Sequence, residues 1–265
     1  MKKPIITNKL FTILGALLLA VSLTPLCQAQ NQVAAPASRT YRVTVTQVKT
    51  GMMEQYQQFL KTQTLAAYKK AGGKEWQTWV VESFGTLGEI WTFRPVEDLQ
   101  QFDEPNFLTK ALGEAGARAW NAKRAQMVVS TRSFLISTAP ALSLPPKSEP
   151  KICIGVRVSV TPGRIAEYAK WLKENGLLAS SKTNAKGVFV NAVGLGGDPN
   201  EVMVAVLFDN FADLAKFPDA YGKAMTDLKL QINPPVGVVT HTEFAVYRYL
   251  PELSLTPPLP GLLRQ

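Results

Sequence analysis

The chain has 265 residues and a formal net charge of +9, with 29 lysines and arginines against 20 aspartates and glutamates. Basic and acidic residues are interspersed and form no clustered basic face, so the composition argues against nucleic-acid binding. A single histidine and two cysteines argue against zinc or copper centres of the usual composition, and we expect no bound metal.

The first 29 residues are typical of a secretory signal peptide. Three lysines at positions 2, 3 and 9 precede an uncharged apolar run at 10–23, which Pro25 ends. This run is shorter than the roughly 20 residues that a membrane-spanning helix requires. We therefore expect a Sec-type leader cleaved after Ala29, no transmembrane segment after cleavage, and a periplasmic or secreted protein.

The two cysteines have different expected fates. Cys27 would leave with the leader, which makes Cys153 the one thiol of the mature protein and excludes an intramolecular disulfide. A lipoprotein signal would instead acylate Cys27, but Leu26 stands where such signals carry a small residue. Cys153 lies in the apolar run 152–154, and we expect it to be buried like most free cysteines.

Hydrophobic periodicity predicts six elements in each of two successive stretches of the chain. In the first, we expect a strand at 41–48, a helix from 53, strands at 76–84 and 89–93, a helical region at 96–123 and a strand at 126–136. In the second, we expect a strand from 151, a helix from 165, strands at 188–193 and 202–208, a helix at 211–230 and a strand at 236–249.

The two stretches also match residue by residue, which indicates a tandem duplication. Aligning Gly51 with Gly163 places Tyr56 on Tyr168 and Leu60 on Leu172. Further along, we match 97–102 with 212–217, Phe134 with Phe244, and the closing segments PALSL at 140–144 and PELSL at 251–255. Because these matches occur in one order, chance similarity is a poor explanation.

The order strand, helix, strand, strand, helix, strand is the ferredoxin-like arrangement of the α+β class. Each such module leaves one sheet face bare, so two modules in one chain are expected to pack sheet to sheet as an intramolecular pseudo-dimer. We divide the chain into a signal peptide (1–29), a flexible N-terminal segment (30–40), a first module (41–136), a Pro/Ser-rich linker (137–150), a second module (151–250) and a Pro-rich C-terminal tail (251–265).

In both modules a first strand leads through a glycine turn into an amphipathic helix, as VKTGMMEQY at 48–56 and VTPGRIAEY at 160–168. This pattern resembles the dimeric α/β-barrel superfamily, especially its antibiotic-biosynthesis monooxygenase and NIPSNAP groups. The resemblance implies a barrel of two four-stranded sheets with a cavity at each module. It also implies relatives that bind small aromatic or polyketide-like molecules, or haem. We find no match here to the set of Asn, Trp and His residues that the oxygenase members use.

The catalytic candidates are His241 and Glu243, which alternation places on one strand face together with Tyr247. His241 could act as a haem ligand, or as a base beside Glu243. The alternative is a strand histidine that only forms hydrogen bonds. Thr131 stands at the matching position of the first module, so any such site would occur once per chain.

The ligand-binding candidates are Trp79, Trp91, Phe93 and Tyr247. Aromatic residues gather on the middle strands of the first module, where the second module carries valines at 190, 204 and 206. This asymmetry favours one pocket lined with rings, although packing of a core would produce the same pattern. Because Trp76 and Trp79 lie three residues apart, they face opposite sides of the strand, and at least one of them can point into the barrel.

Three functions remain open from the sequence. The first is binding of a small apolar or aromatic molecule in the barrel cavity, without a cofactor. The second is a monooxygenase-like enzyme, either cofactor-free or haem-linked. The third is a structural or interaction module of the cell envelope that uses the proline-rich tail.

Overall fold

The computed structural model describes residues 38–146 and 148–255, so the signal peptide predicted at 1–29 and the end of the tail lie outside the described residues. The strands are β1 (Thr40–Val48), β2 (Gln77–Ser83), β3 (Glu89–Val96), β4 (Val128–Thr138), β5 (Ile152–Val160), β6 (Gly187–Val193), β7 (Glu201–Phe208) and β8 (Val239–Tyr249). The helices are α1 (Met53–Phe59), α2 (Leu65–Lys70), α3 (Phe107–Met127), α4 (Ile165–Trp171), α5 (Leu178–Ser180) and α6 (Phe211–Asp227). Within these residues, no helix combines the length and apolar character that crossing a membrane requires.

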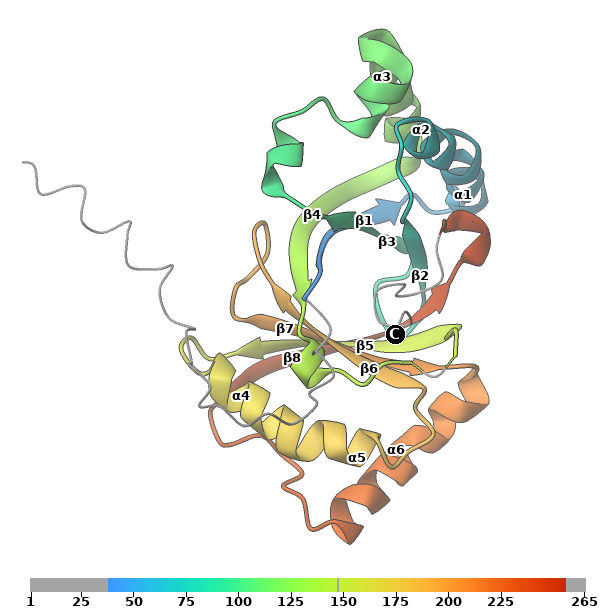
Figure 1. Ribbon diagram of the computed structural model, residues 1–265. Coiled ribbons are helices and arrows are strands. Elements are labelled where there is room, and N and C mark those ends of the chain that lie inside the picture. The colour runs from blue at the N-terminus through green and yellow to red at the C-terminus, as the bar shows by residue number, and fades with distance from the viewer. Residues whose placement is uncertain (1–37, 147, 256–265) are drawn as a thin grey trace, which may run out of the picture. The chain divides into compact units, whose positions relative to one another are not determined.

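The eight strands form one closed antiparallel barrel in the order β1-β3-β2-β8-β5-β7-β6-β4 (Figure 1). The first half, β1 to β4, has the sheet order β4-β1-β3-β2, and the second half has the same order, β8-β5-β7-β6. Figure 1 shows α1 to α3 beside the sheet of the first half and α4 to α6 beside that of the second. The predicted α+β class and the ferredoxin-like order of elements are confirmed.

Two seams close the barrel by joining the second strand of each half to the fourth strand of the other. At one seam, Trp79 on β2 lies opposite Tyr249 on β8. At the other, Ile136 on β4 lies opposite Val193 on β6. The second seam is the shorter of the two, because it pairs only the last residues of β4 with β6.

The closing segments, 140–144 and 251–255, each form a clasp that fastens one half to the other. Each begins with a 3-10 turn, Pro140–Leu142 or Pro251–Leu253. The Ser143 hydroxyl accepts a hydrogen bond from the backbone N–H of Val190 on β6 at 3.1 Å. The Ser254 hydroxyl accepts one from the backbone N–H of Thr78 on β2 at 2.9 Å. The repeated sequence therefore serves contacts between the halves.

Three predicted segments are partly ordered in the structure. The linker predicted at 137–150 includes the last two residues of β4 and the first clasp, so only its later part connects the halves. The N-terminal segment predicted as flexible at 30–40 ends in structure, because Thr40 begins β1 and Arg39 pairs with Glu75 at 2.9 Å. The tail predicted from 251 likewise starts with an ordered clasp.

Strand pairing corrects one residue match between the halves. Val43 on β1 lies opposite Phe134, whereas Gly155, at the corresponding place on β5, lies opposite Ala245. Phe134 therefore corresponds to Ala245, and the predicted match with Phe244 was wrong by one residue. Because side chains alternate along a strand, this shift turns Phe134 into the barrel and leaves Phe244 outside and 60% exposed.

The second helical region of the first half, predicted at 96–123, is also wrong at its start. β3 continues to Val96, a 3-10 turn follows at Leu99–Phe102, and α3 begins only at Phe107. The side chain of Asn106 caps α3 by accepting hydrogen bonds from the N–H groups of residues 108 and 109. Pro105 disfavours helical geometry in the residue before it, which separates the turn from the helix.

Candidate functional site

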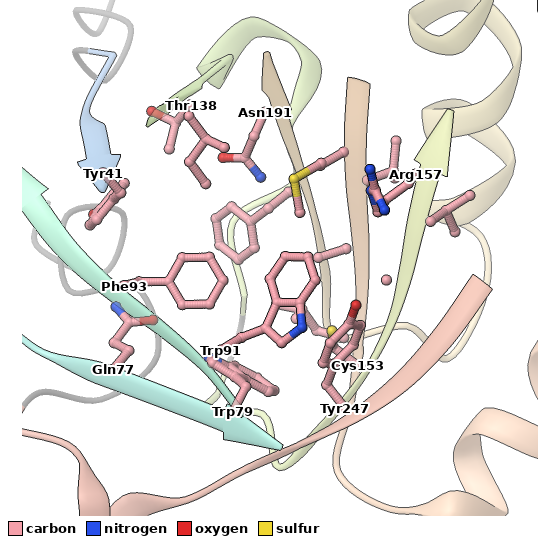
Figure 2. Close-up of a pocket in the computed structure, with 18 residues that line it drawn as sticks. Tyr41, Gln77, Trp79, Trp91, Phe93, Thr138, Cys153, Arg157, Asn191 and Tyr247 are labelled. Carbon is pink, nitrogen blue, oxygen red and sulfur yellow. The ribbon is translucent and has the colours of Figure 1, made fainter. Parts of the chain in front are cut away.

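The four aromatic residues predicted as ligand-binding lie together inside the barrel. Trp79, Trp91, Phe93 and Tyr247 line one cavity between the two sheets (Figure 2). The Trp91 ring packs edge-on against the Tyr247 ring, with 5.3 Å between their centres. Trp79 faces inward, whereas Trp76 on the other side of the sheet packs against Tyr68, as their spacing predicted.

This interior cavity is small and closely surrounded by packed side chains. Its volume is about 90 Å³, whereas pockets for drug-sized ligands usually measure ~300–1,000 Å³. Cys153 lies against it, and burial raises the pKa of its thiol to about 12. The thiol therefore stays protonated at neutral pH, and the expected burial of Cys153 is confirmed.

The catalytic candidates His241 and Glu243 lie outside the cavity. The side chain of His241 is 64% exposed, and its Nε2 is 3.4 Å from Oε1 of Glu243. Glu243 also accepts a hydrogen bond from Arg157 at 2.9 Å. Neither residue lines a described pocket, and the strand pairing matches His241 to Ser130 rather than to Thr131.

A larger hollow lies on the other side of the first sheet, between that sheet and the helices; we call it the sheet–helix cleft. It has two neighbouring parts, a larger pocket of about 800 Å³ and a smaller one of about 250 Å³. Both parts are lined by Arg42, Arg94, Asn106 and Phe107. The larger part falls within the usual range for small-molecule pockets, and the smaller part lies slightly below it but well above the interior cavity.

The sheet wall of this cleft is polar, which is unusual for a sheet face covered by helices. Two cross-strand pairs of β1 and β3 line the cleft, Arg42 with Arg94 and Thr44 with Thr92, and so does Thr46, whose partner Ile90 is buried in an apolar cluster with the helices. The corresponding pairs of β5 and β7 are Ile154 with Val206, Val156 with Val204, and Val158 with Val202. In the second half these residues pack into an apolar core with the helices.

The late start of α3 accounts for the free volume above this polar wall. In the second half, β7 ends at Phe208 and α6 starts at Phe211, so the helix follows its strand directly. In the first half, the residues between β3 and α3 line the larger pocket instead of covering the sheet. Gly113 also interrupts α3 with a φ of 69°, a value that glycine adopts readily.

Arg94 is the most unusual charged group of the cleft. Three aromatic rings surround its guanidinium, at 5.0 Å from the centre of Phe107, 5.7 Å from Trp76 and 5.8 Å from Tyr68. Burial, followed by the charge of Arg42, lowers the pKa of Arg94 to about 10, so the group remains charged at neutral pH.

Sequence reasoning missed this site, although a signal for it was present. Alternation along 41–48 puts an arginine and two threonines on one face, and the same face of 153–160 carries isoleucine and valines. Comparing the two halves for a change from polar to apolar residues would have indicated the wall. The free volume above the wall depends on where α3 begins, and hydrophobic periodicity did not predict that position.

No group of three His, Cys, Asp or Glu side chains within 38–146 and 148–255 is placed to hold a metal ion. The chain's one histidine, His241, is exposed on β8 and lines neither the cavity nor the cleft.

Comparison with known proteins confirms the fold. No protein-family model matches the sequence, and no curated protein matches it. Among solved structures, a candidate monooxygenase from Fusobacterium nucleatum is 13% identical, with a TM-score of 0.54 over 81% of this chain and 93% of that one. A candidate monooxygenase from Lactobacillus acidophilus is 8% identical, with a TM-score of 0.52 over 80% and 94%. An anthrone oxidase-like protein is 11% identical, with a TM-score of 0.52 over 82% and 93%. The expected resemblance to dimeric α/β-barrel proteins thus holds at the level of fold.

Proposed function

We propose that this protein is exported and binds a small apolar or aromatic molecule in the sheet–helix cleft of its first half. The observation that carries this proposal is the polar wall, whose counterpart in the second half is a packed layer of valines and isoleucine. Burying polar side chains without hydrogen-bond partners lowers the stability of the fold. A polar sheet face is therefore expected where solvent or a ligand contacts it. The second half demonstrates that the fold does not require it.

We also propose that the two halves arose by duplication and that only the first retains the site. Both halves have the same sheet order and the same clasp. Both interrupt their first helix with a π-helical turn, at Leu60–Thr64 and at Leu172–Leu177. This architecture supports a monomer that acts as a pseudo-dimer.

A matched pair of substitutions tests the position of the site, with the neutral aromatic 1-naphthamide as the probe. Ser133 lines the smaller pocket, and strand pairing places Phe244 at its position in the second half. We expect Ser133→Phe to fill the pocket and weaken binding about tenfold or more, while Phe244→Ser leaves binding unchanged. If Trp91→Ala changes binding and Ser133→Phe does not, the interior cavity is the site instead.

An oxygenase-type activity is the second candidate, and the fold neighbours favour it. Three structures with this fold are described as monooxygenases or as anthrone oxidase-like. Anthrone is therefore a suitable substrate, since its reaction with O₂ yields anthraquinone and water without another reductant. Oxygen uptake with anthrone that Ser133→Phe abolishes would establish the enzyme, and uptake no faster than without protein would refute it.

Two measurements on protein from the native cell test the remaining parts of the proposal. N-terminal sequencing of the mature protein is expected to start at Gln30 if the leader is cleaved after Ala29. The proposal needs no cofactor, so an absorption spectrum without a Soret band is expected. A Soret band lost in His241→Ala would instead establish haem bound through that residue.

A further inference from the structure

We propose that the ligand of the sheet–helix cleft is an organic anion that binds in the smaller pocket, with its negatively charged oxygens held by Arg94 and Arg42 and its apolar part against the aromatic side of the cleft. This inference rests on the proposed function and specifies the class of ligand.

The charge balance of the smaller pocket is the first support. Arg42, Arg94 and Arg124 line it, and no aspartate or glutamate does. Within the described residues, neither Arg42 nor Arg94 forms an ion pair or a side-chain hydrogen bond, while Arg124 donates only to the hydroxyls of Thr46 and Thr131. Partly buried guanidinium groups normally pair with carboxylates or phosphates. This pocket therefore holds hydrogen-bond donors that lack an anionic acceptor.

The placement of the two arginines is the second support. Arg42 and Arg94 lie directly opposite each other on adjacent strands, where like charges are destabilising. Ile154 and Val206 occupy the same places in the second half, so an apolar pair satisfies the fold. A destabilising pair at a position where the fold accepts apolar residues is expected at a functional site.

The surroundings of Arg94 indicate an organic rather than an inorganic anion. The rings of Tyr68, Trp76 and Phe107 surround its guanidinium and give one side of the cleft an apolar surface. Thr44 and Ser133 add hydroxyls on the sheet wall, and Leu60 and Trp120 add apolar surface from the helices. A flat molecule with one anionic end matches both parts of this lining.

The carboxylate 1-naphthoate and its neutral analogue 1-naphthamide provide the test, by isothermal titration of the full-length mature protein. We expect wild type to bind naphthoate at least tenfold more tightly than naphthamide. Arg94→Met should weaken naphthoate about 10- to 100-fold, the loss expected for charge-assisted hydrogen bonds. It should change naphthamide binding less than about threefold, because the neutral amide has no charge for the guanidinium to hold.

Three controls keep the result interpretable. Arg118→Met removes an equal charge from an exposed position on α3 and should leave both affinities unchanged. Arg94→Lys keeps the positive charge but cannot form bidentate hydrogen bonds to a carboxylate, so it should give an intermediate affinity for naphthoate. If Arg94→Met fails to fold, Arg42→Gln takes its place with the same expectation.

Inorganic phosphate distinguishes an organic anion from a simple one. At equal concentration, phosphate should not displace naphthoate. Equal binding of the acid and the amide, or an unchanged naphthoate affinity in Arg94→Met, would overturn the anion proposal while leaving the cleft as a binding site. Displacement of naphthoate by phosphate would overturn the claim that the anion must be organic. If neither probe binds, or Ser133→Phe affects neither, the proposed function fails.

Discussion

Removing the Ser254 hydroxyl should destabilise the barrel, because this side chain joins the second half to the second strand of the first. Its Oγ accepts a hydrogen bond from the N–H of Thr78 at 2.9 Å and donates to the carbonyl of Leu250 at 2.8 Å. Thr78 is fully buried, so Ser254→Ala leaves its N–H without a partner. Such a loss costs about 1–3 kcal/mol, and we expect a midpoint of thermal unfolding lower by about 4–8 °C for a loss of ~2 kcal/mol.

Urea unfolding monitored by tryptophan fluorescence would measure this loss as a free energy. Ser143→Ala removes the corresponding clasp contact to Val190 and should give a similar loss. Ser181→Ala removes an exposed hydroxyl at the end of α5 and should change stability by less than about 0.5 kcal/mol. If Ser254→Ala also changes stability by less than about 0.5 kcal/mol, the clasp does not stabilise the closed barrel.

Three further outcomes follow from the structure. Cys153 should resist Ellman's reagent in the native protein and react fully in denaturant, because its thiol is buried with a raised pKa; rapid native labelling would contradict this. The hydrogen bonds from Arg248 across the β2–β8 seam hold the pKa of Glu82 below 4.5. This ion pair therefore stabilises the fold by under about 1 kcal/mol above pH 4.5, and the stabilisation is lost as the pH falls. Glu82→Gln should lack this pH-dependent contribution to acid unfolding, and an acid-unfolding curve identical to that of wild type would refute it. Residues 38–146 expressed alone should bind a hydrophobic dye through the uncovered inner sheet face, and a dye-free folded monomer would argue against the barrel.

The sequence was sufficient for the order of elements and for the barrel. Period-2 and period-3.6 patterns specify strands and helices locally, and they recur in both stretches in one order. The bare face of each ferredoxin-like sheet then requires a partner, and a chain with two such modules supplies it. Alternation also placed Trp76 and Trp79 on opposite faces of the strand, and the structure shows that Trp79 is the one that faces inward.

Local patterns were not sufficient where one residue of register mattered. Phe134 and Phe244 look equivalent in the sequence, yet pairing with β1 and β5 places one inside the barrel and the other outside. The segments at 97–102 and 212–217 also look equivalent, but the first forms a 3-10 turn and the second begins a long helix. The residues that follow decide this difference, because Pro105 and the cap at Asn106 start a separate helix in the first half.

The sequence by itself determined the ferredoxin-like modules and their association, because hydrophobic periodicity is a local property and burial of a bare sheet face is a general requirement. Only the tertiary structure decided where a ligand can fit. The ring cluster around Trp91 leaves a cavity of about 90 Å³, whereas the wall at Arg42 and Arg94 faces a much larger cleft. Free volume depends on how far helices stand from a sheet, and that distance is set by packing between residues far apart in the chain.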